Sequence, residues 1–162
     1  MYRVVAGVMA KSLSTAGGGS NYLCLPLQPQ FLPTSRAGSQ STSEIYGVEY
    51  ESSATPVADI PANHDAPCVV CEAQGQGQVL MIPARVTCPA DWRLEYVGLL
   101  MSQAKTHKAA DFVCVSRELE TSRGGQSSHV GGTLYVVEAK CGSLPCPPYQ
   151  EGYEIACVVC TK

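Results

Sequence analysis

Cys68-Val-Val-Cys71 and Cys157-Val-Val-Cys160 are identical tetrapeptides that stand 89 positions apart in a chain of 162 residues. The two valines inside each pair favour extended backbone, because branching at Cβ restricts the side chain and suits it to a pleated surface. In a strand, residues three positions apart face opposite sides. Each tetrapeptide is therefore predicted to lie in a β-strand and to send one sulfur into each of two layers.

Two other uses of the paired cysteines are alternatives. Four thiolates from two such pairs can complete a tetrahedral zinc site, but a zinc knuckle needs a tight turn inside each pair, which two valines resist. A thioredoxin-like redox pair needs a following helix to lower the thiol pKa, and no helical pattern follows either tetrapeptide. Structural disulfides are the expectation, with no metal and no other cofactor.

The number of cysteines indicates the compartment. A reducing cytosol rarely supports nine cysteines without a metal, whereas an oxidising compartment converts them into cross-links. An odd count leaves one cysteine as a free thiol or as a link between chains. We expect a secreted, extracellular protein in which each disulfide contributes about 2–4 kcal/mol to stability.

Alternation of apolar and polar residues with a period of two recurs along the chain, whereas the helical period is nearly absent. This alternation is typical of half-buried strands. Strands broken by turn-rich stretches predict an all-β, disulfide-rich domain. The expected strands cover residues 45–50, 69–73, 79–87, 92–99, 112–116, 133–139 and 153–160.

The remaining segments are assigned as follows. Residues 102–111 alone have a briefly helical pattern, and the Gly- and Ser-rich residues 121–132 are the expected mobile loop. Residues 1–16 are an N-terminal segment ahead of one domain over residues 17–162. Residues 1–10 faintly resemble the charged and apolar parts of a signal peptide, and we interpret them as mature protein.

Two further segments suggest an internal repeat. Residues 79–101 and 134–157 each join an apolar strand, a Cys-Pro pair, an aromatic residue and a second strand. This loose match hints at two similar halves.

Composition and motifs exclude several classes of function. The net charge of −3 is spread without a basic stripe, so nucleic acid is not an expected partner. No apolar run approaches the roughly 18–20 residues of a membrane span. The chain has no GxSxG, no HExxH and no phosphate-binding glycine loop, so it is not expected to be an enzyme. His64 stands beside Asp65, and His107 could share a helical face with Asp111. Ordinary surface polarity is the preferred interpretation of both pairs, ahead of a metal site or acid–base pair.

Several blocks of sequence resemble the C-terminal domain of the sponge short-chain (spongin-type) collagens. They are GGGSNYLCLP at 17–26, VLMIPARVTCPAD at 79–91, CGSLPCPPY at 141–149 and the closing CVVCTK at 157–162. More distantly, CVVCEA at 68–73 followed by IPARVTCPADW at 82–92 is similar to the noncollagenous domain of type IV collagens. The resemblance implies a β-rich domain of two similar halves that forms trimers.

The collagens place this domain after a Gly-X-Y tract, and this chain contains none. We therefore expect a binding module, similar to small secreted sponge lectins that bind N-acetylhexosamines. The expected protein is a metal-independent lectin for glycans or glycoproteins, and a homo-oligomer with a trimer favoured. The alternative is a structural domain that trimerises in the extracellular matrix.

Sugar sites typically combine an aromatic face with a few fixed polar groups. The candidate site residues are Trp92, the only tryptophan, with Asp91 beside it, and His107 with Asp111. The alternative for Trp92 is a place in the core, since the type IV collagen pattern also has a tryptophan there. In that case residues 102–111 and 121–132 are the next loops to consider.

Overall fold

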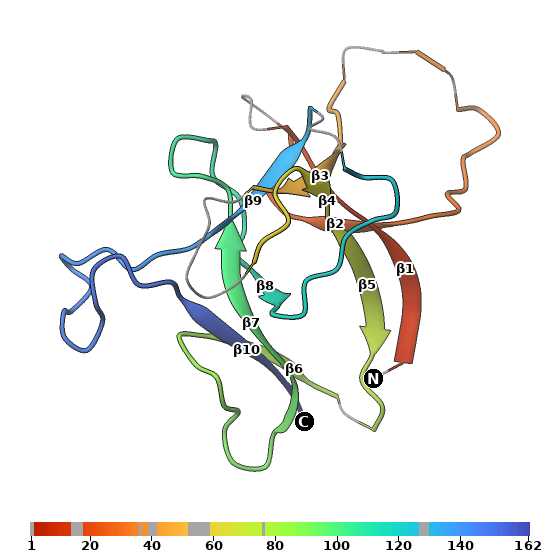
Figure 1. Cartoon of the computed structure of the whole chain (residues 1–162). Coiled ribbons are helices and arrows are strands. Elements are labelled where there is room, and N and C mark those ends of the chain that lie inside the picture. Colours follow the sequence, from red (N-terminus) through yellow and green to blue (C-terminus); the bar gives the residue numbers. More distant parts are fainter. Residues whose placement is uncertain are drawn as a thin grey trace.

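In a computed structural model, the described part of the chain forms one curled sheet of ten strands (Figure 1). The structure describes residues 2–13, 18–35, 37–38, 42–51, 59–75, 77–126 and 130–162, with backbone alone for residues 2–4. Gly17, His129 and part of the predicted mobile loop lie outside these ranges. The strands are β1 (Tyr2–Lys11), β2 (Leu23–Pro26), β3 (Tyr46–Tyr50), β4 (His64–Asp65), β5 (Pro67–Glu72), β6 (Val79–Pro83), β7 (Arg93–Ser102), β8 (Val113–Ser116), β9 (Gly132–Val136) and β10 (Ala156–Thr161).

The all-β, disulfide-rich fold is confirmed. The sheet follows the order β2-β1-β3-β9-β7-β10-β6, with β4 on β3, β5 on β1 and β8 on β7. Each of the seven predicted strands overlaps an observed strand, and no helix occurs among the described residues.

The helical expectation for residues 102–111 is wrong. β7 continues through Ser102, whose hydroxyl lies 3.2 Å from each of the Ala110 and Asp111 carbonyl oxygens. Within the segment, the His107 amide donates to the carbonyl of Ala104 at 2.9 Å. These bonds fold the segment back onto the end of β7, so it is a loop.

β1 is a strand that the sequence did not predict. Its sequence, YRVVAGVMAK, is apolar over most of its length and does not alternate. The strand pairs with β2, β3 and β5, and half-buried apolar side chains occur on both of its faces, with Val5 and Met9 on one and Val8 on the other. Residues 2–10 of the segment compared above with a signal peptide are therefore part of the sheet.

Eight of the nine cysteines form disulfides, as predicted. The pairs are Cys24–Cys68, Cys88–Cys160, Cys114–Cys157 and Cys141–Cys146. All nine cysteines lie within the described ranges, and Cys71 is the one left with a free thiol. Because the sulfurs of the two tetrapeptides have different partners, they do not form a shared four-thiolate site. Four disulfides indicate an oxidising, extracellular-type environment.

A disulfide closes the sheet around β7. Gly98 in β7 has partners on both sides, Ser116 in β8 and Cys157 in β10. The Cys114–Cys157 disulfide joins these two flanking strands, with the Cα atoms 5.8 Å apart. A Cβ at position 98 would lie 2.1 Å from the carbonyl oxygen of Val115. Glycine is therefore required where the disulfide draws β8 and β10 together.

The same arrangement recurs around β1. Gly7 has Pro26 in β2 and Cys68 in β5 as its partners, and the Cys24–Cys68 disulfide joins those strands. A Cβ at position 7 would lie 1.9 Å from the carbonyl oxygen of Leu25. The chain therefore has two similar halves, one built on β1 and the other on β7.

Strand registers repeat between the halves. The β1–β3 pair Ala10↔Gly47 corresponds to the β7–β9 pair Met101↔Val136. The bond from the Met9 amide to the Ala66 carbonyl, 3.0 Å, corresponds to the bond from Leu100 to Ile155, 2.8 Å. The two CVVC tetrapeptides are equivalent at a spacing of 89 positions, whereas β1 and β7 are offset by 91 positions, from Gly7 to Gly98. The earlier comparison of residues 79–101 with 134–157 does not match this register.

The core lies where the halves meet. β3 and β9 pair in parallel, with Tyr50 opposite Leu134. Both side chains belong to one buried cluster, and β6 extends the second half by pairing with the outer edge of β10. Figure 1 shows β1 and β5 on one side of the molecule and β7, β10 and β6 on the other. The full cluster is Val48, Tyr50, Ile60, Ala66, Leu99, Met101 and Leu134.

Candidate functional site

Asp91 and Trp92 lie in the turn before β7. The Trp92 amide donates to the Pro89 carbonyl at 3.2 Å, and Asp91 has a left-handed φ of 66°. Cys88 fixes this turn to β10 through its disulfide with Cys160. Trp92 is half-buried and does not belong to the buried core cluster. A turn therefore precedes β7 at this point, and the indole is partly accessible.

His107 and Asp111 lie in the loop after β7. Asp111 is held by its backbone: its amide donates to the Ser20 carbonyl at 3.4 Å, and its carbonyl accepts from Ser102. Burial, and then the nearby Asp111 carboxylate, raise the pKa of Tyr22, because both disfavour the phenolate. The carboxylate is therefore close to an aromatic ring at this end of the sheet.

The four candidate residues fall into two separate places. Asp91 and Trp92 precede β7, whereas His107 and Asp111 follow it. A strand of ten residues at 3.3 Å per residue is about 30 Å long. One monosaccharide cannot contact both ends.

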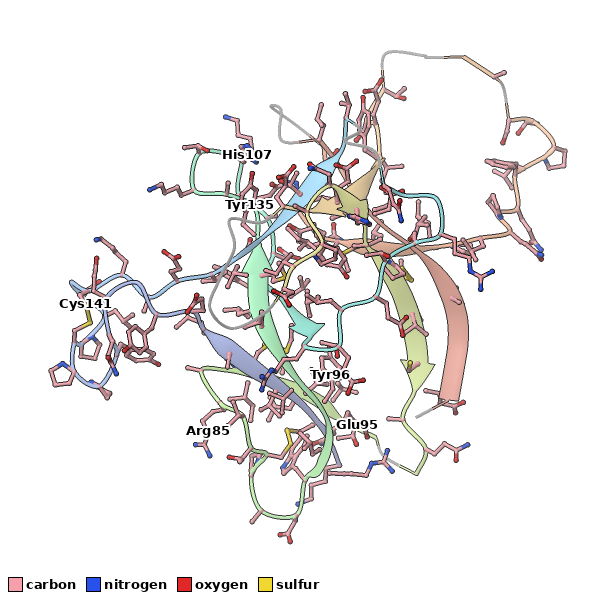
Figure 2. All side chains as sticks on the ribbon, viewed as in Figure 1. Arg85, Glu95, Tyr96, His107, Tyr135 and Cys141 are labelled. Atoms are coloured by element: carbon pink, nitrogen blue, oxygen red, sulfur yellow. A yellow bond between two sulfur atoms is a disulfide. The ribbon has the colours of Figure 1, made fainter. Side chains whose placement is uncertain are left out.

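At the His107 end, polar and aromatic side chains converge (Figure 2). The Thr133 hydroxyl donates to Gln103 Oε1 at 2.5 Å, and His107 Nδ1 lies 3.0 Å from the same oxygen. The Tyr135 ring meets the imidazole edge to face, with centroids 6.0 Å apart. We name Gln103, His107, Thr133 and Tyr135 the His107 cluster.

The His107 cluster also contains a donor without an acceptor. Gln103 Nε2 is buried and has no hydrogen-bond partner among the described residues. A buried polar group left unpaired costs about 1–3 kcal/mol. The His107 cluster therefore combines an unpaired buried donor with the exposed imidazole of His107.

Sequence reasoning named His107, included Gln103 only within the candidate loop 102–111, and missed Thr133 and Tyr135. Gln103 begins the loop after β7, whereas Thr133 and Tyr135 belong to β9. The antiparallel pairing of Ser102 with Tyr135 brings the two segments together across about 30 positions of sequence. No local pattern in either segment indicates this meeting.

A second feature is an open hollow of about 780 Å³ beside β7 and β8. Charged residues of both signs line it, including Asp59, Arg117 and Glu118. Glu95 at its margin accepts from the Thr161 hydroxyl at 2.6 Å and from Arg93, and these bonds lower its pKa. The Glu95 carboxylate is therefore already satisfied within the protein.

The other histidine pair named above has no comparable surroundings. His64 lies in β4, half-buried, with Nδ1 2.9 Å from the Ala62 carbonyl oxygen.

Within the described ranges, no three His, Cys, Asp or Glu side chains gather where they could hold a metal ion. In the same ranges, no helix is long and apolar enough to cross a membrane.

The chain matches no family model, no curated protein sequence and no solved structure. The resemblance to collagen C-terminal domains therefore stays a prediction, and the function is argued from the residues themselves.

Proposed function

We propose that this chain is a secreted, metal-independent lectin for N-acetylhexosamine-type sugars and that the His107 cluster is its site. The observation that carries the proposal is the meeting of an imidazole, a phenol ring and a fixed amide and hydroxyl at one edge of the sheet. Rings stack on the apolar face of a pyranose, and fixed polar groups select its hydroxyl pattern.

The acetamido group is favoured for a specific reason. Its carbonyl oxygen is a strong acceptor, and the Gln103 amide is a buried donor that lacks one, which a bound sugar would reach once the side chain turned outward. Satisfying this amide would recover part of the cost of leaving it unpaired. A plain hexose, with a hydroxyl in place of the acetamido group, is a weaker acceptor and should bind less well.

Affinity for one sugar should be about millimolar, or about −4 kcal/mol. Isothermal titration with N-acetylglucosamine, N-acetylgalactosamine and glucose, each in EDTA, tests the proposal. His107→Ala removes the imidazole and its bond to Gln103, so binding should weaken about fivefold or more. Lys105→Ala is the matched control, because Lys105 is exposed in the same loop and belongs to no contact of the cluster.

Two outcomes would contradict this site. If Trp92→Ala abolished binding while His107→Ala did not, sugar recognition would belong to the opposite end of β7. If EDTA abolished binding by the wild-type protein, recognition would depend on a metal. Circular dichroism of each variant shows whether the fold is retained.

A second candidate function is assembly into a trimer of the extracellular matrix. Apolar side chains are exposed on two strands of the second half: Val79 is 66% exposed in β6 and Leu94 is 51% exposed in β7. Exposed apolar patches mark protein interfaces, and the resemblance to collagen domains favours three copies. Light scattering at micromolar concentration distinguishes a trimer from a monomer of 17.2 kDa. If the protein forms a trimer but binds no sugar in the titration, assembly is the function that remains.

A further inference from the structure

The two halves carry a tyrosine at the same position. In the second half, Tyr135 pairs with Ser102, the last residue of β7. In the first half, Tyr46 pairs with Lys11, the last residue of β1. The registers compared above make these two pairs equivalent, so Tyr46 corresponds to Tyr135 of the His107 cluster. Both tyrosines are half-buried.

The contact beside each tyrosine is also repeated. In the second half, Thr133 stands two residues before the tyrosine, and its hydroxyl donates to Gln103, the first residue after β7. In the first half, Glu44 stands two residues before the tyrosine, and its carbonyl accepts from the hydroxyl of Ser12, the first residue after β1, at 2.7 Å. We name Ser12, Glu44 and Tyr46 the Tyr46 cluster.

The Tyr46 cluster differs from the His107 cluster in its chemistry. The Tyr46 hydroxyl donates to Glu44 Oε2 at 2.6 Å, which places an exposed carboxylate beside a phenol ring. This hydrogen bond, together with the charge of Glu44, raises the pKa of Tyr46, so the phenol stays protonated and continues to donate. An ionised carboxylate has about four acceptor positions, so the Glu44 carboxylate can accept further hydrogen bonds from a ligand.

The charge of Glu44 is not neutralised within the described part of the chain, where this carboxylate has no ion-pair partner. Lys11, which pairs with Tyr46 across the two strands, is 2% exposed, and its Nζ donates to the Ser12 carbonyl at 3.0 Å. The Lys11 ammonium is therefore held by the backbone, and the Tyr46 cluster presents a negative charge to solvent.

We propose that the Tyr46 cluster is a second sugar subsite, and that it binds a hexosamine whose amino group is not acetylated. The ammonium of such a sugar donates charge-assisted hydrogen bonds to the Glu44 carboxylate, and the Tyr46 ring packs against the apolar face of the pyranose. The subsite rests on the proposed function, since its position is the one equivalent to the His107 cluster. The two subsites select different forms of one sugar, because the Gln103 amide is a donor for an acetamido carbonyl and Glu44 is an acceptor for an ammonium.

The two subsites are too far apart to share one monosaccharide. β3 and β9 pair in parallel with Tyr50 opposite Leu134, so Tyr135 lies five positions farther along the sheet than Tyr46. Five positions at 3.3 Å per residue correspond to about 17 Å. One chain therefore binds two sugar residues independently, which lets a single protomer bridge two glycans.

The test is an NMR titration of the whole chain with isotopically labelled tyrosine rings, using glucosamine and N-acetylglucosamine in slightly acidic buffer with EDTA. Tyr46→Phe and Tyr135→Phe identify the two signals among the eight tyrosines. We expect the Tyr46 signal to shift saturably with glucosamine, at a Kd about fivefold or more below that for N-acetylglucosamine. The Tyr135 signal should show the opposite order.

A variant separates the charge of the carboxylate from its hydrogen bond. Glu44→Gln keeps an acceptor for the Tyr46 hydroxyl but removes the charge, so glucosamine should bind about fivefold or more weakly when followed by the Tyr46 signal. Glu72→Gln is the matched control, because Glu72 is an exposed carboxylate at the end of β5. This control should leave both Kd values unchanged.

The outcomes for the subsite and for the proposed function are distinguishable. A Tyr46 signal that does not shift with glucosamine, while the Tyr135 signal follows N-acetylglucosamine, would overturn the subsite and leave the proposed function standing. A Tyr46 signal that shifts beside a silent Tyr135 signal would support the subsite and contradict the His107 cluster as a site. Equal weakening by Glu44→Gln and Glu72→Gln would also overturn the subsite, because the net charge of −3 would then attract the ammonium without this carboxylate.

Discussion

Replacement of Gly98 by alanine tests the closure of the sheet around β7. The added Cβ would lie 2.1 Å from the Val115 carbonyl oxygen and 3.0 Å from the Cys114 sulfur, whereas ordinary contact begins at 3.4 Å. β8 would have to move by more than about 1 Å, against its pairing with β7 and the disulfide to Cys157. Overpacking lowers the free energy of unfolding by about 1–3 kcal/mol. Because the clashing atom belongs to the β8 backbone, we expect a loss at the upper end of this range, about 3 kcal/mol.

Thermal unfolding under non-reducing conditions measures the loss. For a chain of this length, about 3 kcal/mol corresponds to a fall in Tm of roughly 6–12 °C. Gly47→Ala is the matched control, because Gly47 also lies in a strand but a Cβ there meets nothing within 4 Å. Its Tm should be unchanged or slightly higher, since alanine reduces the entropy of the unfolded chain. A Tm for Gly98→Ala within 1 °C of the wild type would refute the closure, and Gly7→Ala should behave like Gly98→Ala if the halves are equivalent.

Three further predictions concern the disulfides and a carboxylate. Removing the Cys114–Cys157 disulfide, with a sequence separation of 43, should lower the free energy of unfolding in urea by about 4 kcal/mol. Removing the Cys141–Cys146 disulfide, with a separation of 5, should lower it by about 2 kcal/mol. Equal losses would contradict the account in which the stabilisation grows with the length of the closed loop. Thiol titration of the unfolded, unreduced protein should find one thiol, in the peptide that contains Cys71, and two or more would contradict the disulfide assignment. The lowered pKa of Glu95, caused first by the Thr161 hydroxyl, stabilises the fold above about pH 4.5, and this contribution is lost as the pH falls through the folded-state pKa. Glu95→Gln should therefore flatten the loss of stability in acid, and an unchanged pH profile would count against the role of this carboxylate.

The strands and the cross-links were predictable from sequence. Alternation of apolar and polar residues indicates the strands β7 and β10. Nine cysteines, four of them in two CVVC tetrapeptides, favour disulfide bonds rather than a zinc site. β1 was missed because apolar residues such as Val5 and Val8 occur on both of its faces, which removes the alternation that identifies a half-buried strand.

The internal repeat was only partly readable. The CVVC spacing of 89 gives the correct alignment of β5 with β10, but the Cys-Pro pairs suggested a different alignment. Cys88 bonds to β10, whereas Cys146 bonds to Cys141 within a local loop, so the two Cys-Pro pairs serve unrelated purposes. Short motifs in a cysteine-rich chain recur for more than one reason, and only the strand registers distinguish them.

The candidate site depended on contacts that sequence cannot supply. His107 and Trp92 were identifiable as polar and aromatic residues near turns. Thr133 and Tyr135 reach His107 only because β9 pairs with the end of β7. The same pairing explains why Trp92, at the far end of β7, is absent from the cluster.

The most direct test of the central claim is an NMR titration of the histidine ring protons with N-acetylglucosamine in EDTA. The wild-type chain has three histidines, so His107→Gln identifies the relevant resonance. We predict that the His107 signal shifts saturably at about millimolar sugar, with half-saturation shared by Tyr135, whereas the His64 signal stays fixed. No saturable shift of the His107 signal up to tens of millimolar sugar, at about ten times the expected Kd, would contradict the proposed lectin site.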